Sequence, residues 1–336
     1  MTDPVPHDAN TPRSAEDGSE TVPVVADLPT KDWDDTSALL HRVFHDERFA
    51  DPAYLNWHYN ESPVGTAIAV DLRDEHEEVF GHGAALPQEF RNAEGNTRFV
   101  QIVNIAILPG RRGENLFAHE ILNHIPHVIE QGVIGGFGVT NANSTDPAIS
   151  LDGLGATLVC QLPVKVLLPS PLWRKGVDTF AVTPDFLESK TFVELCSDLD
   201  QYPAEHWTQR WTLDQLRWRL SRPNTSYALH ATNNVVAITS AAKAKGVPVV
   251  MLMKMLPRYG SRGPLPAEAI VTAACRHHRA PVAMYVGFNA HLPMRGVTVP
   301  RRFLPSPLNL LFLTLGDLDQ ASFRFDTFEF LDFDAF

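Results

Sequence analysis

The sequence predicts a mixed α/β protein, close to α+β in character, in which one fold unit occurs twice. Three pairs of segments support the repeat because they match in the same order along the chain. These pairs are 55–59 with 216–220, 108–113 with 256–263, and 138–141 with 286–289. Their spacing also agrees, since Pro109 precedes Asn141 by 32 residues. Pro257 precedes Asn289 by the same number, so we expect two domains of one type.

Apolar runs and turn signals indicate a sheet with flanking helices in the first half. We expect helices at 30–44, 54–59, 114–131 and 147–153, strands at 66–72, 78–86, 98–108 and 134–140, and extended chain over 156–168. We divide the chain into a disordered acidic tail (1–28), an N-terminal domain (29–168), a linker (169–182) and a C-terminal domain (183–336). The phenylalanines of 323–336 predict a buried strand whose acidic residues face outward.

The charge balance gives no reason to expect a nucleic-acid partner. The net charge is −12, but residues 1–35 carry −7 and residues 317–336 carry −5, so the remaining body is neutral. No apolar run approaches a membrane span, and the three separated cysteines form neither a disulfide framework nor a zinc pattern. The histidine spacing supports no metal site. We therefore expect a cytoplasmic protein without a metal, and the sequence leaves a homodimer open.

A basic turn follows the apolar run 102–108 and opens into an amphipathic helix. The first N–H groups of a helix have no partner inside it, and the helix dipole attracts negative charge there. Arg111 and Arg112 add positive charge at the same place. The turn therefore predicts an anion site, and a molecule that carries phosphate suits it best.

This turn resembles the phosphate loop of the GCN5-related N-acetyltransferase (GNAT) superfamily, which has the pattern Q/R-x-x-G-x-G/A. Arg112 fits the first position, whereas Asn115 stands on the first glycine and Phe117 on the last small residue. Residues 138–144 with 154–155 resemble the exit of the fifth strand in that family. Residues 54–57 with 62–65 resemble GNAT proteins found with polysaccharide and amino-sugar biosynthesis.

The resemblance implies two tandem GNAT-like domains, each a central, mostly antiparallel sheet with splayed fourth and fifth strands and flanking helices. It implies acetyl-CoA or another acyl-CoA as co-substrate. The acyl group would pass to the amine of a small molecule, such as an amino sugar or a natural-product intermediate. The residues that it places at the co-substrate are Ile107, Leu108, Arg111, Arg112, Gly113, Glu114, Asn115, Leu116, Phe117, Asn141, Asn143 and Ser144.

Two residues are candidates for the chemistry of transfer. In the family the amine loses a proton to a side chain or to an oriented water, and a tyrosine after the fifth strand often protonates the leaving sulfur. Leu151 stands at the position of that tyrosine. His82 on the third strand and Asn104 on the fourth could face the cleft, and an imidazole suits a general base. We therefore predict His82 and Asn104 as catalytic residues.

Two other functions remain open. One is a tandem GNAT transferase that uses aminoacyl-tRNA, which the neutral body disfavours because tRNA affinity depends on phosphate neutralisation. The other is a GNAT-derived binding protein without catalysis, which Asn115 and Leu151 favour. In the second half, Pro264 and Pro266 lack N–H groups where phosphate would bind. We therefore expect a degenerate second copy that scaffolds the first and helps form the acceptor cleft.

Overall fold

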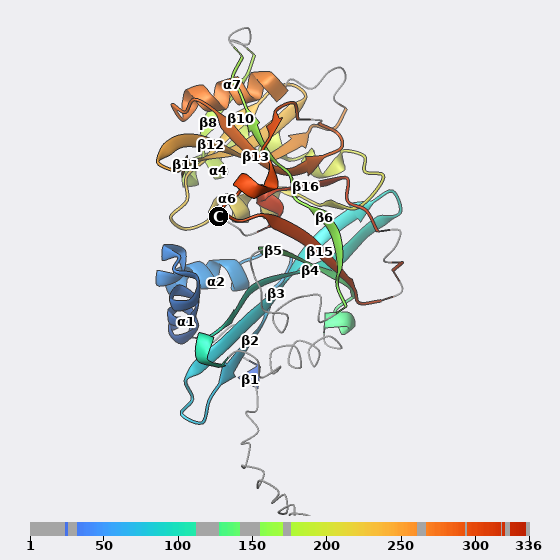
Figure 1. The fold of residues 1–336 in the computed structure, drawn as a ribbon. Coiled ribbons are helices and arrows are strands. Elements are labelled where there is room, and N and C mark those ends of the chain that lie inside the picture. Colours follow the sequence, from blue (N-terminus) through green and yellow to red (C-terminus); the bar gives the residue numbers. More distant parts are fainter. Residues whose placement is uncertain are drawn as a thin grey trace, which may run out of the picture.

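The fold consists of two sheets of mostly antiparallel strands with helices beside them (Figure 1). The structure is a computed structural model that describes residues 24–25, 32–111, 128–141, 155–170, 176–260, 267–292, 294–316, 318–319 and 323–333. The predicted mixed α/β class and the predicted duplication are confirmed. Within the described ranges, no helix has both the length and the apolar character that crossing a membrane requires.

The two sheets have the same strand order. The first sheet contains, in spatial order, β1 (Val24–Val25), β2 (Ile68–Arg73), β3 (Val79–Asn92), β4 (Gly95–Ile107), β5 (Val133–Asn141), β15 (Leu308–Thr314) and β6 (Thr157–Gln161), with β9 (Thr208–Gln209) beside β3. The second contains β8 (Asp178–Ala181), β10 (Tyr227–Ala231), β11 (Val235–Ala244), β12 (Val247–Pro257), β13 (Ala283–Asn289), β7 (Val164–Leu167) and β14 (Val297–Thr298), with β16 (Thr327–Glu329) beside β13. A parallel pair lies at the same place in both, as β4 with β5 and as β12 with β13.

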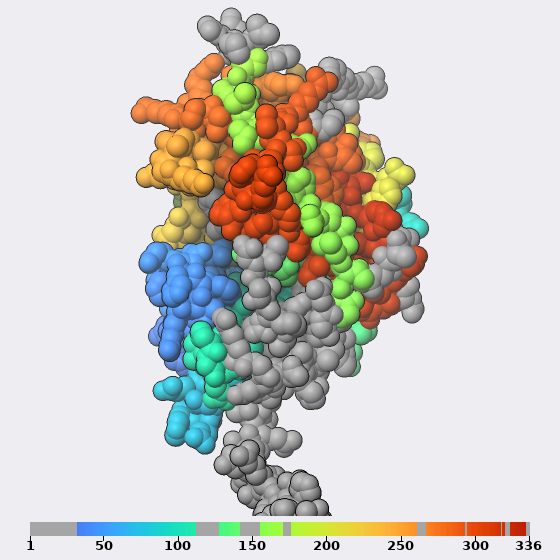
Figure 2. Space-filling model, in the orientation of Figure 1, coloured from blue at the N-terminus to red at the C-terminus, as the bar shows by residue number. Residues whose placement is uncertain are grey.

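Each half of the chain contributes to the sheet of the other half. β7 precedes the predicted linker but pairs with β13 of the second sheet. β15 comes from the second half of the sequence and pairs with β5 of the first sheet. Figures 1 and 2 show this crossing as the green segment that runs from the lower to the upper half. The sheets therefore do not divide the chain at a single point, and the domain limits at 168 and 183 stay a prediction.

Helices flank both sheets. They are α1 (Asp34–Phe44), α2 (Pro52–Asn60), α4 (Pro184–Leu187), α5 (Lys190–Cys196), α6 (Leu213–Leu220) and α7 (Ala267–His277). The helix α2 begins because the Asp51 side chain accepts from the N–H of Ala53 and Pro52 stands in the first turn. The helix α6 begins with a capping box of Thr212 and Gln215. In Figure 2 the blue surface of α1 and α2 lies against the yellow and orange surface of the second half.

The predicted helices of the first half agree with α1 and α2, while most of the helix expected at 114–131 lies outside the described residues, as does the one at 147–153. The expected strands agree with β2, β3, β4 and β5, although β3 and its partner β4 form a longer hairpin than expected. The extended stretch 156–168 forms β6 and β7, which belong to different sheets.

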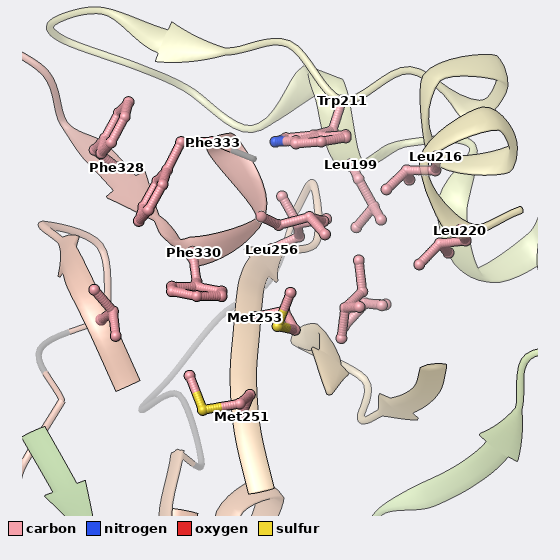
Figure 3. Close-up of a cluster of buried hydrophobic side chains, with 14 of the residues drawn as sticks. Leu199, Trp211, Leu216, Leu220, Met251, Met253, Leu256, Phe328, Phe330 and Phe333 are labelled. Atoms are coloured by element: carbon pink, nitrogen blue, oxygen red, sulfur yellow. The ribbon is translucent and has the colours of Figure 1, made fainter. Parts of the chain in front are cut away.

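One continuous apolar core joins the two halves. Phe90 and Phe137 of the first sheet pack against Phe325 at ring-centroid distances of 5.6 and 6.2 Å. Figure 3 shows Phe328 and Phe333 of the C-terminal segment side by side. In the same cluster lie Met251 and Met253 of β12. Burial of this aromatic surface therefore stabilises both sheets together.

The prediction that the acidic residues of this C-terminal segment face outward is wrong. Within the described part of this segment, 323–333, only 327–329 form a strand, which a 3₁₀ turn (Phe330–Asp332) follows at once. Glu329 and Asp332 are 0% and 2% exposed. They point inward because Lys254, itself buried, supplies the positive charge that buried carboxylates require.

Candidate active site

The parallel strands β4 and β5 pair at their beginnings and then separate. Their backbones pair over 98–102 of β4 and 133–138 of β5. Among the described residues, the following 103–107 and 139–141 do not pair with each other, although each strand keeps its outer neighbour, β3 or β15. We call this region the β4/β5 splay. Its facing N–H and C=O groups need another hydrogen-bonding partner, such as a ligand or water. The predicted splay of the fourth and fifth strands is thus confirmed.

Four of the predicted co-substrate residues lie at the end of this splay. Ile107 ends β4, and the N–H of Leu108 still donates to the carbonyl of Phe80 at 2.9 Å. Asn141 ends β5 and is exposed. The Arg111 guanidinium lies 4.1 Å from the ring centroid of Phe80, which holds a positive charge near the end of β4. The other predicted residues lie outside the described residues, namely Arg112, Gly113, Glu114, Asn115, Leu116, Phe117, Asn143 and Ser144.

A β-bulge in β4 lies beside the splay. His82 of β3 pairs with Ala106, and Ala84 pairs with Val103, so two steps along β3 oppose three along β4. Asn104, within the bulge, has φ +54°. Asparagine adopts this left-handed conformation more readily than most residues, which explains its place here. The bulge brings the partly buried Asn104 to the point where β4 leaves β5.

Asn104 is the last member of a buried chain of hydrogen bonds. Its Nδ2 donates to the Tyr59 hydroxyl at 2.7 Å, and that hydroxyl lies 3.0 Å from Nε2 of His82. Nδ1 of His82 lies 2.7 Å from Oδ1 of Asp71. The Thr36 hydroxyl donates to the same carboxylate at 3.0 Å. The members come from α1, α2, β2, β3 and β4, and Tyr59, His82 and Asp71 are at most 2% exposed.

The carboxylate at the inner end of this chain fixes the direction of every donor. A carboxylate only accepts, so Nδ1 of His82 carries the proton that points to Asp71. In a neutral imidazole Nε2 then accepts from the Tyr59 hydroxyl. The Tyr59 oxygen in turn accepts from Asn104. The amide nitrogen of Asn104 therefore faces Tyr59, and its Oδ1 faces away.

The structure brings the two predicted catalytic residues, His82 and Asn104, into one chain but does not place them equally. His82 is fully buried and both its ring nitrogens are engaged, so it would act on a substrate only through Tyr59. Sequence reasoning missed Tyr59, Asp71 and Thr36. A signal for Asp71 was present, because it is the one acid in the apolar strand 68–72.

The second sheet contains the same splay, but a strand of the chain fills it. β12 and β13 pair only over 250–252 and 283–285. Beyond this point, Gly287 and Asn289 of β13 pair with Glu329 and Thr327 of β16. A Cβ on Gly287, whose φ is +105°, would lie 2.0 Å from the carbonyl oxygen of Phe328. The close approach of β16 therefore requires glycine at this position.

Lys254 of β12 holds the C-terminal segment from the opposite side. Its ammonium lies 2.6 Å from Oδ2 of Asp332 and 3.1 Å from Oε2 of Glu329. The Asn289 amide donates to the carbonyl of Met255 at 3.0 Å and to Glu329 at 3.2 Å, which connects β13 to β12 across β16. The β12/β13 splay thus has an occupant from its own chain. No strand enters the β4/β5 splay in the part of the chain that the structure describes.

The described residues of neither half bring metal ligands together. Across the described ranges, no group of three or more His, Cys, Asp or Glu side chains could hold a metal ion. Burial raises the pKa of the Cys196 thiol to about 12, and it also raises the pKa of the Cys160 and Cys275 thiols, to about 11. None of these thiols is therefore an activated nucleophile.

Comparison with known proteins identifies the fold. No family model and no curated protein matches the chain. A GCN5-related N-acetyltransferase from Kribbella flavida matches with a TM-score of 0.57 and 10% identity, over 87% of this chain and 70% of that one. One from Anabaena variabilis matches with a TM-score of 0.54 and 12% identity, over 83% and 69%. Saccharomyces cerevisiae N-myristoyltransferase, solved with bound myristoyl-CoA, matches with a TM-score of 0.56 and 10% identity, over 90% and 85%. The chain has the tandem GNAT fold.

Proposed function

We propose that the protein is an N-acyltransferase that uses acetyl-CoA or another acyl-CoA and that its active site is the β4/β5 splay. The difference between the two splays carries this proposal. The chain fills the splay of the second sheet with β16, whereas no described strand enters between β4 and β5 in the first splay. The hydrogen-bonded chain that ends at Asn104 lies beside the β4/β5 splay, the one that no described strand fills.

The residues around the β4/β5 splay suit an extended molecule with amide groups and phosphates. On the sides of 103–107 and 139–140 that face each other, N–H and C=O groups can bind pantetheine amides in the way that a sheet edge binds an added strand. Arg111, near the end of β4, and the helix expected after it would attract the phosphates. When bound, acyl-CoA supplies a thioester carbonyl whose carbon an amine can attack.

The role that we assign to the side chains of this site is to position the acceptor amine. The amine nitrogen bonds to the carbonyl carbon, the C–S bond breaks, and sulfur leaves with the electron pair. The nitrogen loses one proton and the sulfur takes one up, so the net reaction is neutral. Asn104 would contact the acceptor because it lies on the bulge beside the splay. His82 would act behind it, through Tyr59.

For the acceptor we propose a small-molecule amine, with an amino sugar or a natural-product intermediate as the finer assignment. The neutral body of the chain favours such an acceptor over tRNA, because it carries no net positive charge to attract a nucleic acid. For the second half we propose a scaffold that binds no acyl-CoA and helps form the acceptor site. β16 supports this because it lies where the pantetheine would pass.

Calorimetric titration with acetyl-CoA, followed by an assay of thiol release, tests the proposal. We expect binding at one site per chain. We then expect CoA release when glucosamine, spermidine or lysine is added, with the largest rate for glucosamine. Titration with desulfo-CoA separates binding of the nucleotide part from turnover. The absence of both heat and thermal stabilisation with acetyl-CoA would contradict the proposal.

A further inference from the structure

We propose that Tyr59 is a positioning residue of this active site, which holds the Asn104 carboxamide with Oδ1 directed at the acceptor amine. His82 and Asp71 act through Tyr59, because they fix the direction of its hydroxyl. This inference rests on the proposed function and extends it to residues that neither the sequence pattern nor the fold assigns.

The strand registers and the sequence repeat give four of the five members of the polar chain a counterpart in the second half. His82 pairs with Ala106 in the first sheet, as Ile238 pairs with Lys254 in the second. Ala106 and Lys254 each stand three residues before the matched prolines of the repeat. Ile238 is therefore the counterpart of His82.

The other counterparts follow from the same registers. Asp71 pairs with His82 in the first sheet, and Leu229 pairs with Ile238 in the second. The repeated helix segments 55–59 and 216–220 match Tyr59 with Leu220. Asn104, two residues before Ala106, matches Leu252. Tyr59, Asp71, His82 and Asn104 thus each have a leucine or isoleucine as counterpart, and these counterparts are buried: Leu220, Leu229, Ile238 and Leu252.

The comparison of the two halves shows whether the polar residues are needed for folding or for function. The second half shows that the same fold packs with apolar side chains at all four positions. Apolar side chains of similar size usually stabilise a core at least as well as a buried polar chain does. Folding alone therefore does not require Tyr59, His82 or Asp71. The polar set occurs in the half whose splay no described strand fills, and the apolar set in the half that β16 fills.

The direction of the hydrogen bonds defines what Tyr59 does. Its oxygen accepts from Nδ2 of Asn104 at 2.7 Å, so the amide cannot turn over without losing this bond. Oδ1 of Asn104 accepts no hydrogen bond from the other described residues, and Asn104 is only partly buried. An amine N–H can donate to this oxygen, which directs the nitrogen lone pair away from Asn104 and toward the thioester carbon.

Without the hydroxyl, the Asn104 amide has two orientations, and one of them presents its NH₂ group to the amine. The NH₂ group of Asn104 and the N–H of the acceptor amine are both donors, so they would repel each other. The amine nitrogen would then be misplaced for attack on the thioester carbon. We expect the loss in the transfer step, because acyl-CoA would bind through the strand backbones and its phosphates rather than through the Tyr59 hydroxyl. We therefore expect a lower kcat with unchanged affinity for acetyl-CoA.

The experiment compares Tyr59→Phe with Tyr227→Phe, a buried tyrosine of the second half that lies outside the polar chain. The assay measures CoA release from acetyl-CoA with a mixture of glucosamine, spermidine and lysine, and calorimetry measures the dissociation constant of acetyl-CoA. We expect Tyr59→Phe to lower kcat by about 30-fold or more and to change that constant by less than about twofold. We expect Tyr227→Phe to change neither.

A double-mutant cycle shows whether Tyr59 acts through Asn104. Asn104→Gly keeps the left-handed backbone and removes the carboxamide. Tyr59→Phe should then have no further effect on kcat in the Asn104→Gly background, because the group that it positions is absent. Independent, multiplicative losses would overturn the proposal, since a general structural role predicts them.

A fourfold variant that carries the residues of the second half provides the folding control. It combines Tyr59→Leu, Asp71→Leu, His82→Ile and Asn104→Leu. We expect it to bind acetyl-CoA and to lack transfer. Unchanged kcat in Tyr59→Phe, or loss of acetyl-CoA binding in parallel with kcat, would overturn the positioning role. If the wild-type protein neither binds acetyl-CoA nor releases CoA, the proposed function itself fails, and the positioning role fails with it.

Discussion

Trp57 and Trp218 each donate their indole N–H to the backbone carbonyl of the other, and both distances are 3.0 Å. Their rings stack with centroids 5.1 Å apart and planes inclined by 20°. They occupy matching positions in the repeated segments 55–59 and 216–220, so the contact relates α2 and α6 by approximate twofold symmetry. This pair connects the helix that carries Tyr59 to the second half of the chain.

Replacing one member of this pair should destabilise the whole protein. Trp218→Phe keeps the stacked ring but loses the indole donor, so we expect the free energy of unfolding to fall by about 1 kcal/mol. Trp218→Ala also loses the ring packing, and we expect about 2–4 kcal/mol. Urea denaturation checks both values. Phe303→Ala, at a position that is 62% exposed, serves as the control with a change below about 0.5 kcal/mol.

The left-handed backbone of Asn104 makes a prediction about stability that is separate from catalysis. Alanine is strained at φ +54° by about 1 kcal/mol, whereas glycine is not. Asn104→Gly should therefore be at least as stable as Asn104→Ala, the reverse of the usual order within a strand. Chemical denaturation of the two variants measures the difference. A more stable alanine variant would show that the bulge has another backbone conformation.

The buried cluster of Lys254, Glu329 and Asp332 predicts a pH dependence of stability. One ammonium balances one carboxylate, and Asp332 is the nearer. Burial raises the pKa of Glu329 to about 7. Because the folded state then holds a proton that the unfolded state releases near pH 4.3, the contribution of Glu329 is fully present below about that pH. It is lost as the pH rises through about 7.

The variant Glu329→Gln removes this titration. Its free energy of unfolding should therefore fall less between pH 4.5 and pH 7.5 than that of the wild-type protein, where about 1.4 kcal/mol corresponds to one pKa unit. Denaturation curves recorded across this range provide the comparison. The same decline in both proteins would mean that Glu329 does not hold the proton.

The charge near the end of β4 predicts the affinity for acyl-CoA. Arg111→Ala should weaken acetyl-CoA binding by about tenfold and reduce its dependence on salt, because a charge-assisted contact to phosphate is lost. Arg258 follows the matched proline of the second copy and donates to the carbonyl of Glu194. Arg258→Ala is therefore the matched control and should bind normally. Equal affinities in the two variants would remove Arg111 from the site.

Much of the fold could be predicted because its signals are local. Alternating apolar residues predicted the strands β2 to β5. Short matching segments such as 55–59 and 216–220 indicated the repeat. The exchange of β7 and β15 could not be predicted, because strand patterns do not say which sheet a strand joins. For the same reason, the sequence could not predict that β16 occupies the β12/β13 splay. Only the tertiary pairing of Gly287 with Glu329 reveals it.

The candidate site was predictable to a smaller extent. His82 and Asn104 were found from residue type and strand position. Their link through Tyr59 depends on how α2 packs on β3, which a sequence pattern does not contain. The burial of the acidic residues in the C-terminal segment could not be predicted, since their partner Lys254 lies 75 residues away from Glu329 in the sequence.

The most direct test of the central claim is a crystal structure of the protein with acetyl-CoA. We predict density for one molecule per chain, with the pantetheine between 105–108 and 137–141 and the thioester beside Asn104. Density beside β16, or in the cavity of about 710 Å³ lined by Tyr202, Tyr259 and His291, would contradict the account.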